Sequence, residues 1–149
     1  KVELMEQVKY LNLQDAISFS AFESDVEALI KRVDIVLNFS ESESFSLTCL
    51  EALWYGTPLI ATDCGGPKEL FEHEKSGLLV PVKDVERMSS AIVKLASDKQ
   101  LQSSFSYAGK IYVRSKFNRE KIAQALEDLY RTLILVPKVT VCFIFLLSI

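Results

Sequence analysis

Three short apolar runs rich in β-branched residues alternate with helical segments, and this order constrains the fold more than any other feature of the sequence. The runs are Val33–Phe39, Pro58–Thr62 and Leu78–Val80. Between the first two lies a helical stretch, Ser46–Tyr55, which is ended by Gly56. Strands joined through helices pair in parallel, because the crossover returns the chain to the same end of the sheet. The sequence therefore predicts an α/β fold, a parallel sheet with flanking helices.

The segments on either side of this unit are predicted to be mostly helical. Residues 1–13 carry apolar side chains at helical spacing, and Ser24 with Glu27 forms a capping box that opens a short helix. The alternating segment Ile17–Phe22 predicts one further strand. The C-terminal part is all helical in pattern, with expected helix starts at Asp84, Asp98 and Asn118.

The composition favours a single cytoplasmic domain that does not bind its partner through bulk charge. The chain has 149 residues, is 49% hydrophobic and carries a net charge of −3. Charges of both signs are interspersed, which argues against nucleic acid as a partner. The three cysteines have no metal-ligand spacing and fit a reducing compartment, and Cys49 is expected to be a buried thiol because it falls within an apolar helix.

A loop and the helix that follows it place two carboxylates around a helix N-terminus. Glu43 lies in the loop and Glu51 in the helix. The first amides of a helix lack partners within it and its dipole is positive at that end, so the position suits a phosphate. In open parallel sheets, ligands bind at the carboxyl ends of the strands. Since carboxylates accept hydrogen bonds from sugar hydroxyls, the combination indicates a ligand with hydroxyls and phosphates, such as a nucleotide sugar.

The block around these glutamates resembles the Glu-x7-Glu motif of retaining GT-B glycosyltransferases of family 4. The residues that carry the resemblance are Glu43, Phe45, Leu47, Glu51, Ala52 and Gly56, followed by residues 57–63, 65–70 and 76–81. The resemblance implies that residues 1–134 form part of a C-terminal Rossmann-like domain, and residues 135–149 a hydrophobic tail of unknown role. The chain departs from the family at Ser44 and Ser46, where Gly is usual, and at Phe39, where Pro is common.

The resemblance also implies a role for each residue of the block. Glu43 is expected to face the transferred sugar, and Glu51 to hold the ribose hydroxyls of the nucleotide. The amides expected at the diphosphate and sugar belong to Ser44, Phe45, Ser46, Leu47 and Thr48. Phe22 and Glu23 are candidate nucleobase contacts, although Phe22 is equally expected as a core residue. The family works without a bound metal or other cofactor, so neither is expected here.

The reaction implied for the parent enzyme is transfer of a sugar from a nucleotide diphosphate sugar to an acceptor hydroxyl, with retention of the anomeric configuration. The acceptor would be a sugar or a lipid-linked glycan, as in polysaccharide or glycolipid synthesis, with the enzyme in the cytoplasm or at the cytoplasmic face of a membrane. Complete family members also have an N-terminal domain and two earlier strands, so this chain by itself is expected to be inactive and poorly stable.

Two alternatives come from other functional classes. Glycosidases also use paired carboxylates, but they need an acid and a base on opposite sides of one glycosidic bond. Glu51 lies in the helix behind the expected phosphate-binding position, which fits that geometry badly. The other alternative is an inactive nucleotide-binding or interaction module, which would bind the donor without turnover.

The segment Val139–Ile149 is almost entirely apolar. It is too short for a membrane-spanning helix, which needs about 20 residues. An added strand, a buried tail or an artefact of the gene sequence is favoured over a membrane-associating tail.

Overall fold

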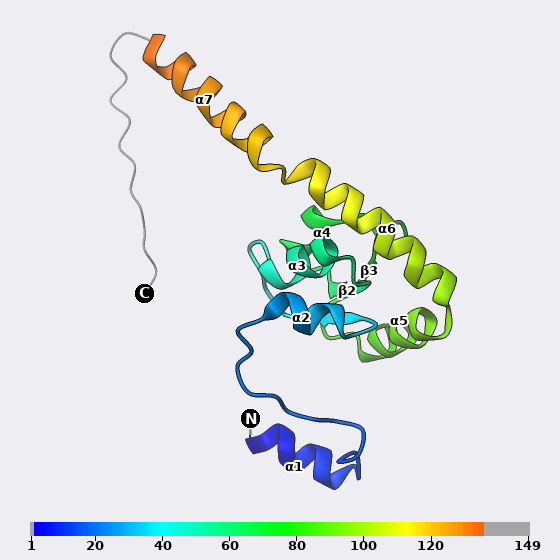
Figure 1. The fold of residues 1–149 in the computed structure, drawn as a ribbon. Helices are drawn as coiled ribbons and strands as arrows, with labels where there is room; N and C mark the ends of the chain where they lie inside the picture. The colour runs from blue at the N-terminus through cyan, green and yellow to red at the C-terminus, as the bar shows by residue number, and fades with distance from the viewer. Residues whose placement is uncertain (1, 136–149) are drawn as a thin grey trace.

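A computed structural model describes residues 2–135 of the chain, which form three strands and seven helices. In chain order these are α1 (Val2–Tyr10), α2 (Val26–Lys31), β1 (Val36–Asn38), α3 (Leu47–Tyr55), β2 (Leu59–Thr62), α4 (Pro67–Leu70), β3 (Leu78–Val80), α5 (Val85–Ser97), α6 (Lys99–Lys116) and α7 (Arg119–Leu135). Figure 1 shows α2 to α6 gathered around the sheet, while α1 and α7 extend away from it.

The three strands form one parallel sheet in the order β1-β2-β3. Val36 pairs with Leu59, and Ile60 pairs with Leu78. All four residues of β2 are buried, as expected for the central strand of a parallel sheet covered on both faces. The predicted α/β class with flanking helices and a helical C-terminal part is thus confirmed, although β1 is shorter than the predicted strand Val33–Phe39.

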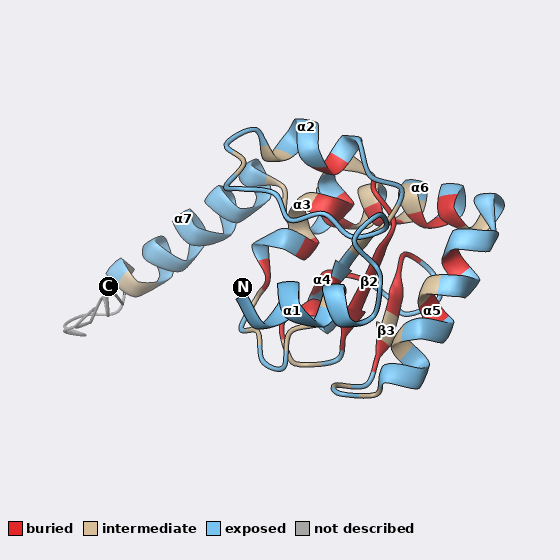
Figure 2. Cartoon of the chain, turned by 90° about the horizontal axis from the view of Figure 1, so that it is seen from below, coloured by how far each residue is buried: buried red, intermediate tan, exposed pale blue. Residues whose placement is uncertain are grey.

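The core lies in two clusters, and alternate residues of β2 supply them. Leu59 and Ala61 pack with Leu53 of α3 and Val113 of α6, whereas Ile60 faces the other cluster. Side chains of the second cluster come from β3, α5 and α6, namely Leu78, Val80, Ala91, Leu95 and Phe105. Figure 2 shows the buried strands between these helices. Each fully buried Leu or Phe stabilises the fold by about 1.5–3 kcal/mol.

Most predicted helix boundaries are confirmed, because they depend on local capping. Asp84 and Asp98 are the N-caps of α5 and α6, and their side chains accept hydrogen bonds from the amides of Arg87 and Leu101 in the first turns of these helices. Asn118 does the same for α7 through the amide of Lys121. For α2 the cap is Asp25 rather than the predicted Ser24, since Asp25 accepts from the amide of Ala28 at 2.9 Å.

The prediction of a strand at Ile17–Phe22 is wrong, because these residues have no regular secondary structure. A strand exists only when its amides and carbonyls pair with a neighbour, and the three described strands pair only with one another. The expectation that Phe22 belongs to the core is also wrong, since its side chain is 95% exposed.

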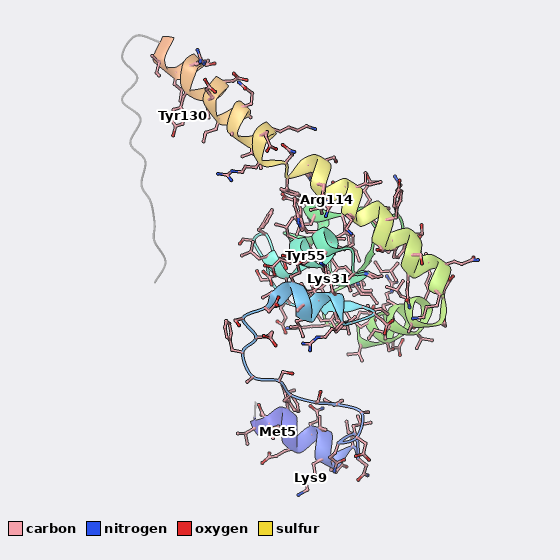
Figure 3. The ribbon with its side chains drawn as sticks, in the orientation of Figure 1. Met5, Lys9, Lys31, Tyr55, Arg114 and Tyr130 are labelled. Carbon is pink, nitrogen blue, oxygen red and sulfur yellow. The ribbon has the colours of Figure 1, made fainter. Side chains whose placement is uncertain are left out.

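The helix predicted within residues 1–13 is confirmed as α1, but its apolar side chains, like those of α7, are not buried by the described residues. Met5 lies on the surface of α1 and Tyr130 on that of α7 (Figure 3). No helix among residues 2–135 is long and apolar enough to cross a membrane. The apolar segment Val139–Ile149, predicted to be an added strand, a buried tail or an artefact, lies outside the described residues.

Candidate functional site

The loop between β1 and α3 carries Glu43, and backbone contacts with the loop after β2 fix its place. The amide of Gly66 donates to the carbonyl oxygen of Glu43 at 2.7 Å, and the amide of Glu43 donates to the carbonyl oxygen of Cys64 at 3.4 Å. Glu43 and Gly65 form a parallel bridge that continues the β1–β2 pairing beyond the strands. Glu43 therefore stands at the carboxyl end of the sheet, where the sequence predicted it.

The two ends of the same loop are tied to the last residue of β1. The Asn38 side chain donates from Nδ2 to Oγ of Ser46 at 2.7 Å, and its Oδ1 accepts from the amide of Ser40 at 3.2 Å. The hydroxyl of Thr62, at the end of β2, donates to the carbonyl oxygen of Ser40. Sequence reasoning missed Asn38, whose only signal was a polar residue closing an otherwise apolar strand.

The N-terminus of α3 opens at the end of this loop. Ser46 is the N-cap, and its Oγ accepts from the amide of Cys49 at 3.4 Å. Its φ of +72° lies in the left-handed region that favours glycine. Leu47 and Thr48, the first residues of the helix, are exposed, and the first amides of a helix have no acceptor within it.

The two glutamates stand on either side of that helix end. Glu43 is half-buried, and one of its carboxylate oxygens accepts from the hydroxyl of Ser40 at 3.0 Å. Glu51 is half-buried one turn into α3, beside a cavity of about 410 Å³. The residues lining this cavity are Val26, Leu29, Ile30, Val33, Ile35, Val36, Thr48 and Glu51. Glu43 is not among them, so the two carboxylates face different parts of the surface around the start of α3.

The cavity beside Glu51 is held by the docking of α2 on α3. The hydroxyl of Thr57 donates to the carbonyl oxygen of Ile30 at 2.9 Å. The ammonium of Lys31 lies 5.7 Å from the ring centroid of Tyr55, and the two side chains meet between the helices (Figure 3). Apolar walls with one carboxylate suit a ligand that has both a flat apolar part and hydroxyl groups.

The two candidate nucleobase contacts lie elsewhere. Phe22 points into solvent, and Glu23 accepts a hydrogen bond from the amide of Asp25 and lies 3.9 Å from Arg32. Neither residue lines the cavity beside Glu51. The strand predicted at Ile17–Phe22, at whose end these two residues were expected to face the site, is not formed. Their contact with a nucleobase therefore stays a prediction.

The predicted buried thiol of Cys49 is confirmed, in the first turn of α3. Burial raises the pKa of Cys49 above its ordinary value of 9.0, and the charge of Glu43 adds to the rise, while hydrogen bonds with Ser46 and Asn38 oppose it. The thiol is therefore neutral at physiological pH and acts as a core residue. Among residues 2–135, no three His, Cys, Asp or Glu side chains come together as metal ligands.

Comparisons with known proteins show what the chain is similar to. The sequence model of the family described as Glycosyl transferases group 1 matches residues 1–112. N-acetyl-alpha-D-glucosaminyl L-malate synthase of Bacillus anthracis is 32% identical over 127 residues, which cover 85% of this chain and 33% of that protein.

Solved structures show the same fold. HepE of Anabaena, in complex with UDP, superposes with a TM-score of 0.83 at 25% identity, covering 87% of this chain and 36% of that one. Sucrose-phosphate synthase of Thermosynechococcus elongatus gives a TM-score of 0.79 at 30% identity over 88% of this chain and 33% of its own. The chain thus spans about a third of the length of these relatives.

Proposed function

The chain belongs to the family of group 1 glycosyl transferases, and from that premise we propose that it is the nucleotide-sugar-binding part of a retaining GT-B glycosyltransferase of family 4. The observation that carries the proposal is the unit formed by β1, its loop and α3. This unit holds Glu43 at the carboxyl end of the sheet, begins α3 directly after the loop, and carries Glu51 one turn into that helix beside the cavity. The HepE structures hold UDP and UDP-glucose, which supports a donor of this class.

Each part of the unit would bind a different part of the donor. The apolar cavity takes the nucleoside, where the carboxylate of Glu51 accepts hydrogen bonds from the ribose hydroxyls. The exposed amides at the start of α3, Leu47 and Thr48, meet the diphosphate together with those of Ser44, Phe45 and Ser46. Glu43, held by Ser40, accepts hydrogen bonds from the hydroxyls of the transferred sugar.

In the proposed reaction the bond between the anomeric carbon and the β-phosphate oxygen breaks, and its electron pair leaves with the nucleoside diphosphate. The acceptor oxygen bonds to the anomeric carbon on the same face, and its proton passes to the departing diphosphate. Negative charge grows on the diphosphate in the oxocarbenium-like transition state. Fixed amides at the end of α3 stabilise that charge more than the charge of the bound substrate. No step requires Glu43 as a nucleophile.

The proposal extends to the acceptor and the setting. A sugar or lipid-linked glycan would be the acceptor, in polysaccharide or glycolipid synthesis, with the enzyme in the cytoplasm or at the cytoplasmic face of a membrane. Curated relatives include lipopolysaccharide core biosynthesis enzymes of Rhizobium meliloti, which supports polysaccharide or glycolipid synthesis. The proposed site uses no metal, so EDTA should leave sugar transfer unchanged.

Calorimetry with UDP-, GDP- and ADP-sugars, followed by an NMR assay of sugar transfer by the full-length protein, tests the proposal. We expect one nucleotide series to bind and the product to keep the donor's anomeric configuration. An inverted product would refute retention. Binding without transfer to any glycan acceptor would favour the non-catalytic module instead.

A further inference from the structure

We infer that Asn38 is the residue that positions the phosphate- and sugar-binding loop, an inference that rests on the proposed function. Asn38 is the last residue of β1, and only 8% of it is exposed. Its side chain therefore does not reach the ligand region directly. It acts through the loop, by holding both of the loop's ends.

The orientation of the Asn38 amide follows from its partners. The amide of Ser40 can only donate, so the atom that it meets at 3.2 Å is the carbonyl oxygen Oδ1. The other atom, Nδ2, then donates to Oγ of Ser46 at 2.7 Å. One side chain thus binds Ser40, the second residue after β1, through its acceptor, and Ser46, the last residue before α3, through its donor, so it ties both ends of the loop to the end of β1.

The hydrogen bonds of Asn38 matter most at Ser46. It has a left-handed backbone, with φ +72° and ψ 88°, in which non-glycine residues are strained. Its Oγ receives two hydrogen bonds, from Asn38 and from the amide of Cys49, and these hold it in that conformation. The conformation of Ser46 in turn sets the direction of the free amides at the start of α3.

Loss of Asn38 should weaken the binding of some parts of the donor molecule and leave the binding of others unchanged. The loop carries Glu43 and the amides of Ser44, Phe45 and Ser46 that are proposed for the diphosphate and sugar. Six of the eight residues that line the nucleoside cavity belong to α2, to β1 or to the segment between them, and the other two are Thr48 and Glu51 of α3. Loss of Asn38 should therefore weaken the binding contributed by the β-phosphate and the sugar, and leave the binding contributed by the nucleoside. A purely structural role would weaken all three contributions equally.

The test uses the full-length protein and three probes, UMP, UDP and UDP-glucose, or the guanosine or adenosine series if wild type prefers it. Asn38→Ala removes both contacts, and Asn38→Leu removes both while filling the space of the side chain. Asn118→Ala is the matched control, because it removes an asparagine contact to a backbone amide at the start of α7. Calorimetry gives the affinities and thermal melts check the fold.

We expect both Asn38 variants to bind the monophosphate within twofold of wild type, and the diphosphate and the nucleotide sugar at least tenfold more weakly. Asn118→Ala should bind all three like wild type, even where it melts earlier. Unchanged affinity of Asn38→Ala for the diphosphate would overturn the inference and leave the proposed function intact, and so would an equal loss for all three probes. If wild type binds no nucleotide of any series, the proposed function fails and the inference fails with it.

Discussion

The amide nitrogen of Gly66 donates to the carbonyl oxygen of Glu43 over 2.7 Å, so the loop after β2 supports the loop after β1 through its backbone. A Cβ atom at Gly66 would lie 2.4 Å from the amide nitrogen of Phe45, closer than non-bonded atoms can approach. The φ of Gly66 is −51°, which any residue adopts, so glycine is required there for space and not for conformation.

We therefore expect Gly66→Ala to lower the free energy of unfolding by about 1–3 kcal/mol, the usual effect of overpacking, because two backbones must move apart. The same movement displaces Glu43, so donor binding should fall as well. Chemical denaturation and calorimetry measure the two effects. A variant that melts and binds like wild type would contradict the expectation.

Gly56→Ala is the matched control for that change. Gly56 ends α3 with a φ of +86°, and the atoms nearest to a Cβ there would be the ends of the Lys110 and Ser106 side chains, at 3.2 Å. The strain of a left-handed alanine costs about 1 kcal/mol or slightly more. Gly56→Ala should therefore lower stability without changing donor affinity.

Local signals predicted most of the fold, because capping and strand composition depend on few neighbouring residues. Asp84 and Asp98 each accept an amide three residues ahead, and such contacts can be recognised from sequence. The strand expected at Ile17–Phe22 failed for the opposite reason. Alternation of apolar and polar residues describes one strand only. Whether that strand forms depends on a neighbouring strand that pairs with it, and the sequence alone does not show where that neighbour lies.

The candidate site was predicted as a set of residues but not as a set of contacts. The positions of Glu43 and Glu51 around the start of α3 follow from the strand, loop and helix pattern. The contacts of Asn38 with Ser46, and of Gly66 with Glu43, form only after the loop folds back on the sheet. Neither contact has a periodic or compositional signal, so only the structure reveals what supports the loop.

Cys49 should make stability fall at high pH. Burial raises its pKa above the ordinary 9.0, so above about pH 9 the unfolded thiol ionises while the folded one stays neutral. The unfolded state then binds fewer protons than the folded state, and stability decreases by up to about 1.4 kcal/mol per pH unit until the folded pKa is reached. Below pH 9 the stabilisation is fully present.

Melting temperatures measured between pH 7 and 10.5 test this linkage. Cys49→Ala should flatten the decline above pH 9. Cys64→Ala, which changes a less buried thiol, should keep the decline. A decline of equal steepness in wild type and in Cys49→Ala would show that other groups cause it.

Glu51→Ala should weaken nucleotide binding by about 10–100-fold, since hydrogen bonds to a charged group contribute about 1.5–3 kcal/mol. Glu51 is half-buried at the edge of its cavity, so the fold should survive the change. The ligand provides an internal control. Wild type should prefer UDP over its 2′,3′-dideoxy form, and Glu51→Ala should bind both equally. A mutant that keeps the preference would show that the ribose is held by another residue.

Glu43→Gln should lower the rate of sugar transfer by about 100-fold, the effect of losing one well-placed group that stabilises the transition state. The glutamine keeps the shape of the side chain and its contact with Ser40, but it lacks the charge that strengthens hydrogen bonds from sugar hydroxyls. Affinity for UDP should change less than twofold, because UDP has no transferred sugar. Glu41→Gln is the control: Glu41 is exposed and pairs with Lys83 at 2.9 Å, a surface ion pair whose loss has little effect. Steady-state kinetics of sugar transfer separate the two, and equal rates in both variants would remove Glu43 from the proposed mechanism.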